Sequence, residues 1–263
     1  MISYDYISIW VASGAHSMPP FPPLLGTMAC TFQGDRVTLQ GRWFEPTGPS
    51  RGLAVIAHPY GFLGGSQDDV TVKIIARILT QQGLYAVTYN ARGIGESEGR
   101  GSWSLQPEAF DMRLVVQQAM EQTPAFTSTS RPLLYIVGYS AGSLQASTVR
   151  PMKTGRWADA YVQYVLLSYP LGVRWALTSF HTLKFNAALE ELIRLDKSSS
   201  STSVCVIYTT RDQFTSQESY ATWIEHLRTL SPHLVVHRVE GDHYWREPSM
   251  QRTLIETLRA PQH

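Results

Sequence analysis

The sequence is poor in cysteine, which narrows the classes of protein it can belong to. It has only two cysteines, and Cys205 lies in the apolar run Val204–Ile207, where a free thiol packs as a small hydrophobe. This scarcity excludes a disulfide-rich secreted scaffold and favours free thiols over a disulfide with Cys30. We therefore expect a reducing compartment and a cytoplasmic protein.

An excess of one charge and long apolar runs are also missing. The chain has 22 Lys and Arg against 21 Asp and Glu, a formal net charge of +1. This balance argues against a nucleic-acid-binding surface. The apolar stretches are too short to span a bilayer, and residues 1–10 carry no Lys or Arg, unlike a signal peptide. The expectation is a soluble protein without a membrane span.

The overall composition is that of a folded globular domain. Hydrophobic residues make up 43% of the chain and charged residues 16%, which is enough apolar material for a sizeable core. Near the N-terminus, the proline-rich segment 18–23 cannot join a central sheet or a helix interior. We predict that residues 1–35 form an arm on a single domain of residues 36–263, although segments near 28–33 and 37–45 are strand-like.

Short apolar runs then alternate with amphipathic segments. The runs have the length of strands and are rich in β-branched and aromatic residues, whereas apolar residues between them recur at helical spacing. This alternation predicts an α/β domain with a doubly wound, mostly parallel sheet and helices on both faces. A lid, if any, is small and falls at about 169–200. The predicted strands are 53–57, 84–89, 133–137, 161–167, 204–208 and 234–239, and the helices lie around 72–79, 112–119, 185–195 and 220–227.

One segment combines a strand, a serine between two glycines, and a helix. The apolar strand Leu134–Val137 runs into Gly-Tyr-Ser-Ala-Gly at 138–142, and a helix is expected over 143–149. The glycines leave room for a sharp turn that would expose the Ser140 hydroxyl at the edge of the sheet. Gly-x-Ser-x-Gly also arises by chance, so the interpretation depends on the placement between a buried strand and a helix.

A serine hydroxyl needs a base to act as a nucleophile, and two suitable residues follow it in the chain. Asp212 follows the apolar strand that begins at Val204, and His243 follows the next strand. In a parallel sheet all three side chains would lie at the carboxyl edge, where open α/β sheets bind ligands. We predict Ser140 as the nucleophile, His243 as the general base and Asp212 as the carboxylate that orients the histidine.

Each partner of the serine has an alternative interpretation. Asp212 could instead cap a helix that starts near residue 215 or 216. Asp242 is a rival carboxylate beside His243, and we interpret it as a turn residue. Most of the other histidines lie in the arm, on a helix, in a turn or within a strand, and have weaker claims. His181 lies in the region of the predicted lid and is a candidate substrate contact.

Backbone N–H groups would have to stabilise an oxyanion formed at Ser140. Ala141, directly after the serine, would supply one of them. The loop His58-Pro59-Tyr60-Gly61 follows the strand at 53–56. Because proline has no N–H to donate, we choose Tyr60 as the second donor, with Gly61 in reserve. The predicted substrate-binding residues are Gly61, Tyr139 and His181.

These motifs resemble those of the α/β-hydrolase superfamily, in particular its small, cap-poor members of the esterase, thioesterase and peptidase type. The resemblance covers about residues 37–259 and includes the chain order Ser, Asp, His. It also includes Asn-Ala-Arg-Gly-Ile-Gly-Glu-Ser at 90–97, similar to a superfamily loop that braces the active-site edge. This loop lacks the Lys-Ser/Thr of a P-loop. The pair His58-Pro59 departs from the usual His-Gly, and the arm has no counterpart.

The resemblance implies a serine hydrolase that forms an acyl-enzyme and cleaves an ester or thioester, with no cofactor and no metal. Aromatic residues such as Tyr169 and Trp175 suggest a small, apolar acyl substrate. No nucleic acid is expected as a partner, and the oligomeric state is not indicated. Two alternatives stay open: the same fold used for a lyase, isomerase or cyclisation step, and a non-catalytic binding module.

Overall fold

A computed structural model describes residues 26–128, 131–179, 181–198 and 200–259. Residues 1–25 of the predicted arm lie outside the described residues. The remainder of the predicted arm includes a strand, β1 (Thr27–Gln33), which pairs antiparallel with its neighbour along its whole length. The sheet therefore begins before residue 36.

The described strands form one sheet of eight, in the order β1-β2-β4-β3-β5-β6-β7-β8. Strands β3 to β8 run parallel to one another, and β2 runs antiparallel to both β1 and β4. This arrangement confirms the predicted mostly parallel α/β sheet. The other strands are β2 (Thr38–Phe44), β3 (Gly52–Ala57), β4 (Leu84–Tyr89), β5 (Leu133–Tyr139), β6 (Tyr161–Leu167), β7 (Thr202–Arg211) and β8 (Val235–Asp242).

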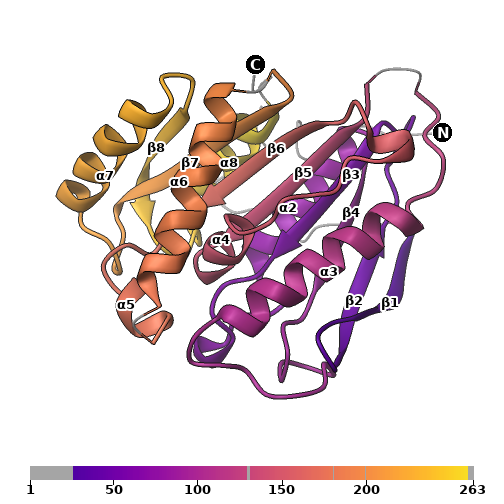
Figure 1. The fold of residues 1–263 in the computed structure, drawn as a ribbon, viewed down its shortest axis with the longest axis horizontal. Helices are drawn as coiled ribbons and strands as arrows, with labels where there is room; N and C mark the ends of the chain where they lie inside the picture. Colours follow the sequence, from indigo (N-terminus) through magenta and orange to yellow (C-terminus); the bar gives the residue numbers. More distant parts are fainter. Residues whose placement is uncertain (1–25, 129–130, 180, 199, 260–263) are drawn as a thin grey trace.

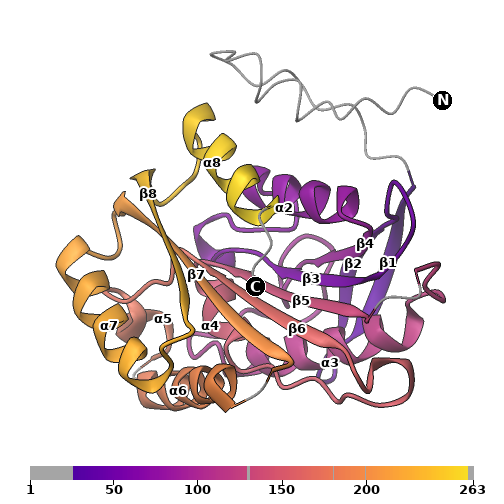
Figure 2. The same cartoon turned by 90° about the horizontal axis from the view of Figure 1, so that it is seen from above.

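Helices cover both faces of the sheet, and each face has its own apolar core (Figure 2). One face carries α2 (Val70–Gln81) and α8 (Pro248–Arg259). The other carries α3 (Gln106–Gln122), α4 (Ala141–Ala146), α6 (Thr182–Ser198) and α7 (Gln217–Leu230). Every residue of β3 is buried, as expected for a central strand with helices on both sides. The short elements are α5 (Arg174–Leu177), η1 (Gly61–Leu63) and η2 (Gly155–Trp157).

The stretch predicted as a small lid contributes mainly a helix that covers the sheet. Helix α6 packs against α7 and β7, and its residues Leu189, Leu192 and Ile193 belong to the core on that face (Figure 1). The described residues therefore form no large cap, in agreement with the sequence. Within the described residues, none of the helices is long and apolar enough to cross a membrane.

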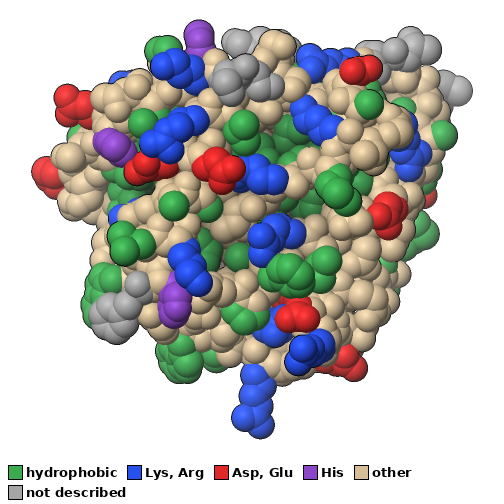
Figure 3. Space-filling view, viewed as in Figure 1, with side chains coloured by type: hydrophobic (Ala, Val, Ile, Leu, Met, Phe, Trp, Pro, Cys, Tyr) green, Lys and Arg blue, Asp and Glu red, His purple; other side chains and the backbone are tan. Residues whose placement is uncertain are grey.

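The molecular surface reflects the near-neutral composition. On the face covered by α3 and α6, acidic and basic side chains are interspersed among hydrophobic ones (Figure 3). The described residues on this face do not gather into a broad area of one charge.

Candidate active site

Three loops at the carboxyl edge of the sheet bring together the side chains selected from the sequence. Ser140 directly follows β5, Asp212 directly follows β7, and His243 directly follows β8. These strands belong to one parallel run in which β5 and β7 are separated only by β6. The edge is where parallel α/β sheets place ligands.

The turn that carries Ser140 is strained, as the two flanking glycines predicted. Ser140 has φ 54° and ψ −119°, a conformation that non-glycine residues rarely adopt. Its N–H donates to the carbonyl oxygen of Leu167 on β6 at 2.8 Å, which fixes the turn against the sheet. A Cβ atom at Gly142 would lie 2.5 Å from the carbonyl oxygen of Ala57, so the helix can approach β3 only with glycine there.

Ser140, His243 and Asp212 form a continuous chain of hydrogen bonds. The distance from Ser140 Oγ to His243 Nε2 is 2.8 Å, and that from His243 Nδ1 to Asp212 Oδ2 is also 2.8 Å. Only 4% of the His243 side chain and none of the Asp212 side chain is exposed. In the neutral imidazole, Nδ1–H donates to the carboxylate and Nε2 accepts the serine proton. The geometry is that of a serine paired with an oriented base.

The second oxygen of Asp212 is occupied by its own loop. Oδ1 accepts hydrogen bonds from the N–H groups of Phe214 at 2.8 Å and Thr215 at 3.1 Å. The N-cap of α7 is Ser216, so Asp212 is not the cap of that helix. Asp242, the rival carboxylate, accepts from the N–H of Tyr244 at 3.0 Å in a turn. In the structure the two carboxylates therefore have different partners, and Asp212 contacts the imidazole.

The loop that carries His243 is held from two sides. Its N–H donates to Gln213 Oε1 at 3.0 Å, and its carbonyl oxygen accepts from the Tyr139 hydroxyl at 2.8 Å. Burial raises the pKa of Tyr139, which keeps this hydroxyl a donor. Tyr139 was predicted to bind substrate. Tyr139 does line the cavity beside Ser140, but its hydroxyl contacts the histidine loop.

The two predicted oxyanion donors flank the serine. Ala141 is the first residue of α4, so its N–H has no acceptor within the helix. Tyr60 is the N-cap of η1 and lines the cavity. Among the described residues, no hydrogen bond from the Tyr60 N–H is found. Both N–H groups are thus available for a ligand.

His58 supports the loop that carries Tyr60, a role that the sequence did not reveal. Its Nδ1 lies 2.5 Å from the carbonyl oxygen of Pro59, and its Nε2 accepts from the N–H of Ala91 at 2.9 Å. Because one ring nitrogen donates and the other accepts, the imidazole is neutral. Burial lowers the pKa of His58 to about 4. The sequence showed only that His58 directly follows the strand β3, at the edge where the site lies.

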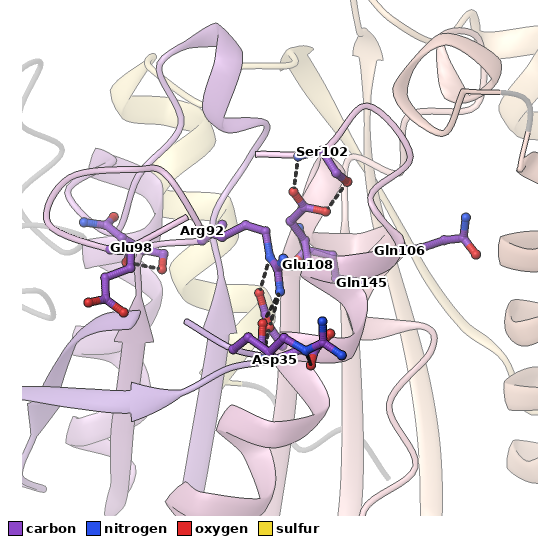
Figure 4. A network of polar contacts seen from close by, with 12 residues as sticks. Asp35, Arg92, Glu98, Ser102, Gln106, Glu108 and Gln145 are labelled. Atoms are coloured by element: carbon purple, nitrogen blue, oxygen red, sulfur yellow. Dashed lines mark hydrogen bonds and ion pairs between the residues drawn. The ribbon is translucent and has the colours of Figure 1, made fainter. Parts of the chain in front are cut away.

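A polar network fixes the loop that follows β4 (Figure 4). Arg92 Nε and Nη2 contact the two carboxylate oxygens of Asp111 at 2.7 and 2.8 Å. Glu108 accepts from the N–H and the hydroxyl of Ser102, both at 2.5 Å. These contacts join the loop to α3, as expected for a segment that braces the active-site edge. Gly61 packs against Ile94 of this loop and does not line the cavity beside Ser140.

A cavity of about 570 Å³ opens beside Ser140 and His243. His181 is not on its wall, and the Nδ1 of that residue instead lies near the carbonyl oxygens of Thr178 and Ser179. Tyr169 is buried and stacks on Trp223 at 5.0 Å, so it belongs to the core. The remaining lining residues are Pro59, Tyr60, Leu63, Gly64, Gly65, Asp69, Tyr139, Pro170, Val173, Leu177, Phe214, Tyr244 and Arg246.

Several of these wall residues were not selected from the sequence. Phe214 and Tyr244 lie within two positions of Asp212 and His243, and both rings pack against the imidazole. Proximity in the chain was the only available signal for them. Within the described ranges, no group of three or more His, Cys, Asp or Glu side chains is arranged to hold a metal ion.

No protein-family model matches the chain. Among curated proteins, it is similar to a polyketide transferase of Penicillium crustosum, with 31% identity over 137 residues. That match takes in 51% of this chain and 36% of the transferase, so it spans about a third of the relative's length.

Solved structures resemble the chain over nearly its whole length. A serine hydrolase without a lid from Xanthomonas campestris superposes with a TM-score of 0.63 at 21% identity, covering 91% of this chain and 95% of that one. An esterase of Pyrococcus furiosus gives a TM-score of 0.66 at 16% identity, covering 93% of each chain. At such identities the likeness concerns the fold.

Proposed function

We propose that this chain, which has the α/β-hydrolase fold without a lid, is a serine hydrolase that cleaves an ester or thioester through an acyl-enzyme. One observation carries the proposal: the Ser140 Oγ, His243 and Asp212 are linked by two hydrogen bonds of 2.8 Å at the carboxyl edge of the sheet. A binding module would have no need for a buried, oriented base beside a serine on a strained turn. The likeness to esterases and serine hydrolases supports the same assignment.

The first half of the reaction forms the acyl-enzyme. His243 Nε2 takes the proton from Ser140 as Oγ attacks the carbonyl carbon, and the carbonyl electron pair moves onto the oxygen. Asp212 holds the imidazole tautomer and stabilises the imidazolium that forms. When the tetrahedral intermediate collapses, the bond to the leaving oxygen or sulfur breaks, and His243 gives that atom its proton.

Water completes the cycle. His243, now neutral, takes a proton from water as the water oxygen attacks the acyl carbon, and the proton passes to Ser140 as its bond to carbon breaks. The N–H groups of Tyr60 and Ala141 are the proposed donors to the oxyanion in both halves. Each such donor contributes about 10²–10³ in kcat in serine hydrolases.

The walls of the cavity suggest an apolar acyl group. Leu63, Val173 and Leu177 lie on its lining. Burying a small alkyl chain among these side chains contributes about 0.8 kcal/mol per methylene group. The described residues form no large cap over the site, so within them the cavity is open to a substrate. We also propose a cytoplasmic location, which the free thiols of Cys30 and Cys205 support.

Turnover of p-nitrophenyl butyrate tests the assignment. The wild type should release p-nitrophenolate, and Ser140→Ala should reduce the rate to background while the circular dichroism spectrum is unchanged. Ser219→Ala, an exposed serine on α7, is the matched control and should keep full activity. Undiminished turnover by folded Ser140→Ala would contradict the proposal.

A further inference from the structure

Arg246 is a cationic side chain on the wall of the cavity beside Ser140. It follows His243 by three positions, in the loop between β8 and α8. Its guanidinium lies 4.8 Å from the centre of the Tyr244 ring, which holds the cation at the cavity. Within the part of the chain that the structure describes, Arg246 forms no ion pair with an acidic side chain. A guanidinium in this position retains its capacity to bind an anion.

The acidic residue on the same wall is already engaged. Asp69 caps α2, and its Oδ1 accepts from the N–H groups of Thr71 at 2.8 Å and Val72 at 3.3 Å. No ion pair joins this carboxylate to Arg246. The helix N-terminus offsets part of the negative charge of Asp69. Arg246 is close enough to favour the charged form of Asp69, but no ion pair joins the two side chains, so the guanidinium N–H groups remain available to another anion.

The chemistry of the reaction says which part of a substrate Arg246 would meet. His243 has to protonate the leaving oxygen or sulfur, so the leaving group must lie on the His243 side of the serine. Arg246 and Tyr244 belong to the same loop as His243 and flank that side. The apolar residues Val173 and Leu177 line the same cavity but come from a different segment, the one after β6.

We propose that Arg246 determines specificity by binding an anionic group, a carboxylate or a phosphate, on the alcohol or thiol part of the substrate. The inference rests on the proposed function and names its substrate class: esters or thioesters with an apolar acyl group and an anionic leaving group. The covalent steps are those given above, and Arg246 takes no proton in them. It orients the leaving group toward His243 Nε2.

Paired acetyl esters test this assignment. One pair is 4-acetoxybenzoate and its methyl ester, which differ by the charge on the leaving group. The second pair is 4-acetoxyphenyl phosphate and the neutral 4-methoxyphenyl acetate, and it tests recognition of a phosphate on the leaving group. The quantity measured is the ratio of kcat/KM for the anionic ester to that for the neutral ester, in the wild type, Arg246→Gln, Arg246→Lys and the control Arg228→Gln. Arg228 is an exposed arginine on α7 away from the cavity.

We expect Arg246→Gln to lower the ratio about fivefold for at least one anionic ester, because a charge-assisted contact is lost. Arg246→Lys should retain most of the ratio, and Arg228→Gln should leave it unchanged. The pair with the larger change identifies carboxylate or phosphate as the preferred group. If Ser140-dependent hydrolysis occurs but neither ratio changes in Arg246→Gln, the role of Arg246 is wrong and the proposed function stands. If the wild type hydrolyses none of the esters, both the proposed function and the role of Arg246 are contradicted.

Discussion

The hydroxyl of Tyr139 donates a hydrogen bond of 2.8 Å to the carbonyl oxygen of His243. The contact joins the end of β5, directly before Ser140, to the loop that carries His243, although the two residues are far apart in the sequence. Both partners are buried. It therefore couples the position of His243 to that of Ser140, and the distance between their reacting atoms depends on it.

Tyr139→Phe should separate positioning from chemistry. The His243 carbonyl would lose its buried donor, which costs about 1–3 kcal/mol of folding free energy. We expect a several-fold loss of kcat/KM with an unchanged pH profile, because the base itself remains. Urea denaturation and steady-state kinetics measure the two effects. Tyr135→Phe on the same strand is the control. An equal loss of kcat/KM in the two variants would contradict the coupling of Tyr139 to His243.

Asp212→Asn should remove most of the activity with little loss of stability. The amide oxygen can still accept from Phe214 and Thr215, but the amide NH₂ would face Nδ1 and favour the wrong imidazole tautomer. A loss of about 10⁴ in kcat is expected, as for the same change in other serine hydrolases. The companion variant Asp242→Asn should lose less than tenfold. A similar loss in both would mean that the carboxylate is misassigned.

The elements of the fold were predictable because each has a strong local signal. The apolar runs near 53–57 and 161–167 coincide with β3 and β6 almost residue for residue. Strands β7 and β8 extend further than their apolar cores, to Arg211 and Asp242, because backbone pairing continues where side chains are no longer buried. Hydrophobic periodicity cannot detect that extension.

Loss of the buried ion pair at Asp111 should destabilise the fold strongly. Only 1% of the Asp111 side chain is exposed, and it contacts Arg92 at 2.7 Å. Asp111→Ala would leave the arginine without its partner, at a cost of about 3–5 kcal/mol. Asp68→Ala removes an exposed partner of Arg42 and should cost less than about 1 kcal/mol. Guanidinium denaturation of both variants provides the comparison, and similar costs would contradict the bracing role of this loop.

The buried imidazole of His58 should make stability depend on pH. The pKa of His58 is about 4 in the folded protein, against 6.5 for an unperturbed histidine. Between these values the unfolded chain binds a proton that the folded chain does not. The stabilisation, about 3 kcal/mol, is therefore fully present above pH 6.5 and is lost as the pH falls toward 4.

Two measurements check this dependence. The His58 ring resonances in NMR spectra of the wild type should titrate near pH 4, or stay unchanged until the protein unfolds. In denaturation experiments, the stability of His58→Gln should change less than that of the wild type between pH 6.5 and 4, whereas the exposed His226→Gln should follow the wild type. A titration of His58 near 6.5 would contradict its buried, neutral state.

The residues around the serine were less predictable than the serine itself. Ser140 is marked by the strand, the two glycines and the helix that surround it, all of which are local. The wall residues Phe214, Tyr244 and Arg246 depend on the path of two loops, which no periodicity specifies. His181 was selected from its place in the chain, and the turn between α5 and α6 instead directs its Nδ1 to backbone carbonyls. The hydrogen bonds of His58 are likewise set by long-range contacts.

Labelling by a fluorophosphonate tests most directly whether Ser140 is an activated nucleophile. Such a probe reacts only with a serine whose proton can be taken by a base. We predict one adduct per chain, located by mass spectrometry on the peptide that contains Ser140, and loss of labelling in Ser140→Ala and His243→Ala. A folded wild-type protein that takes up no probe, or an adduct on another serine, would contradict the account.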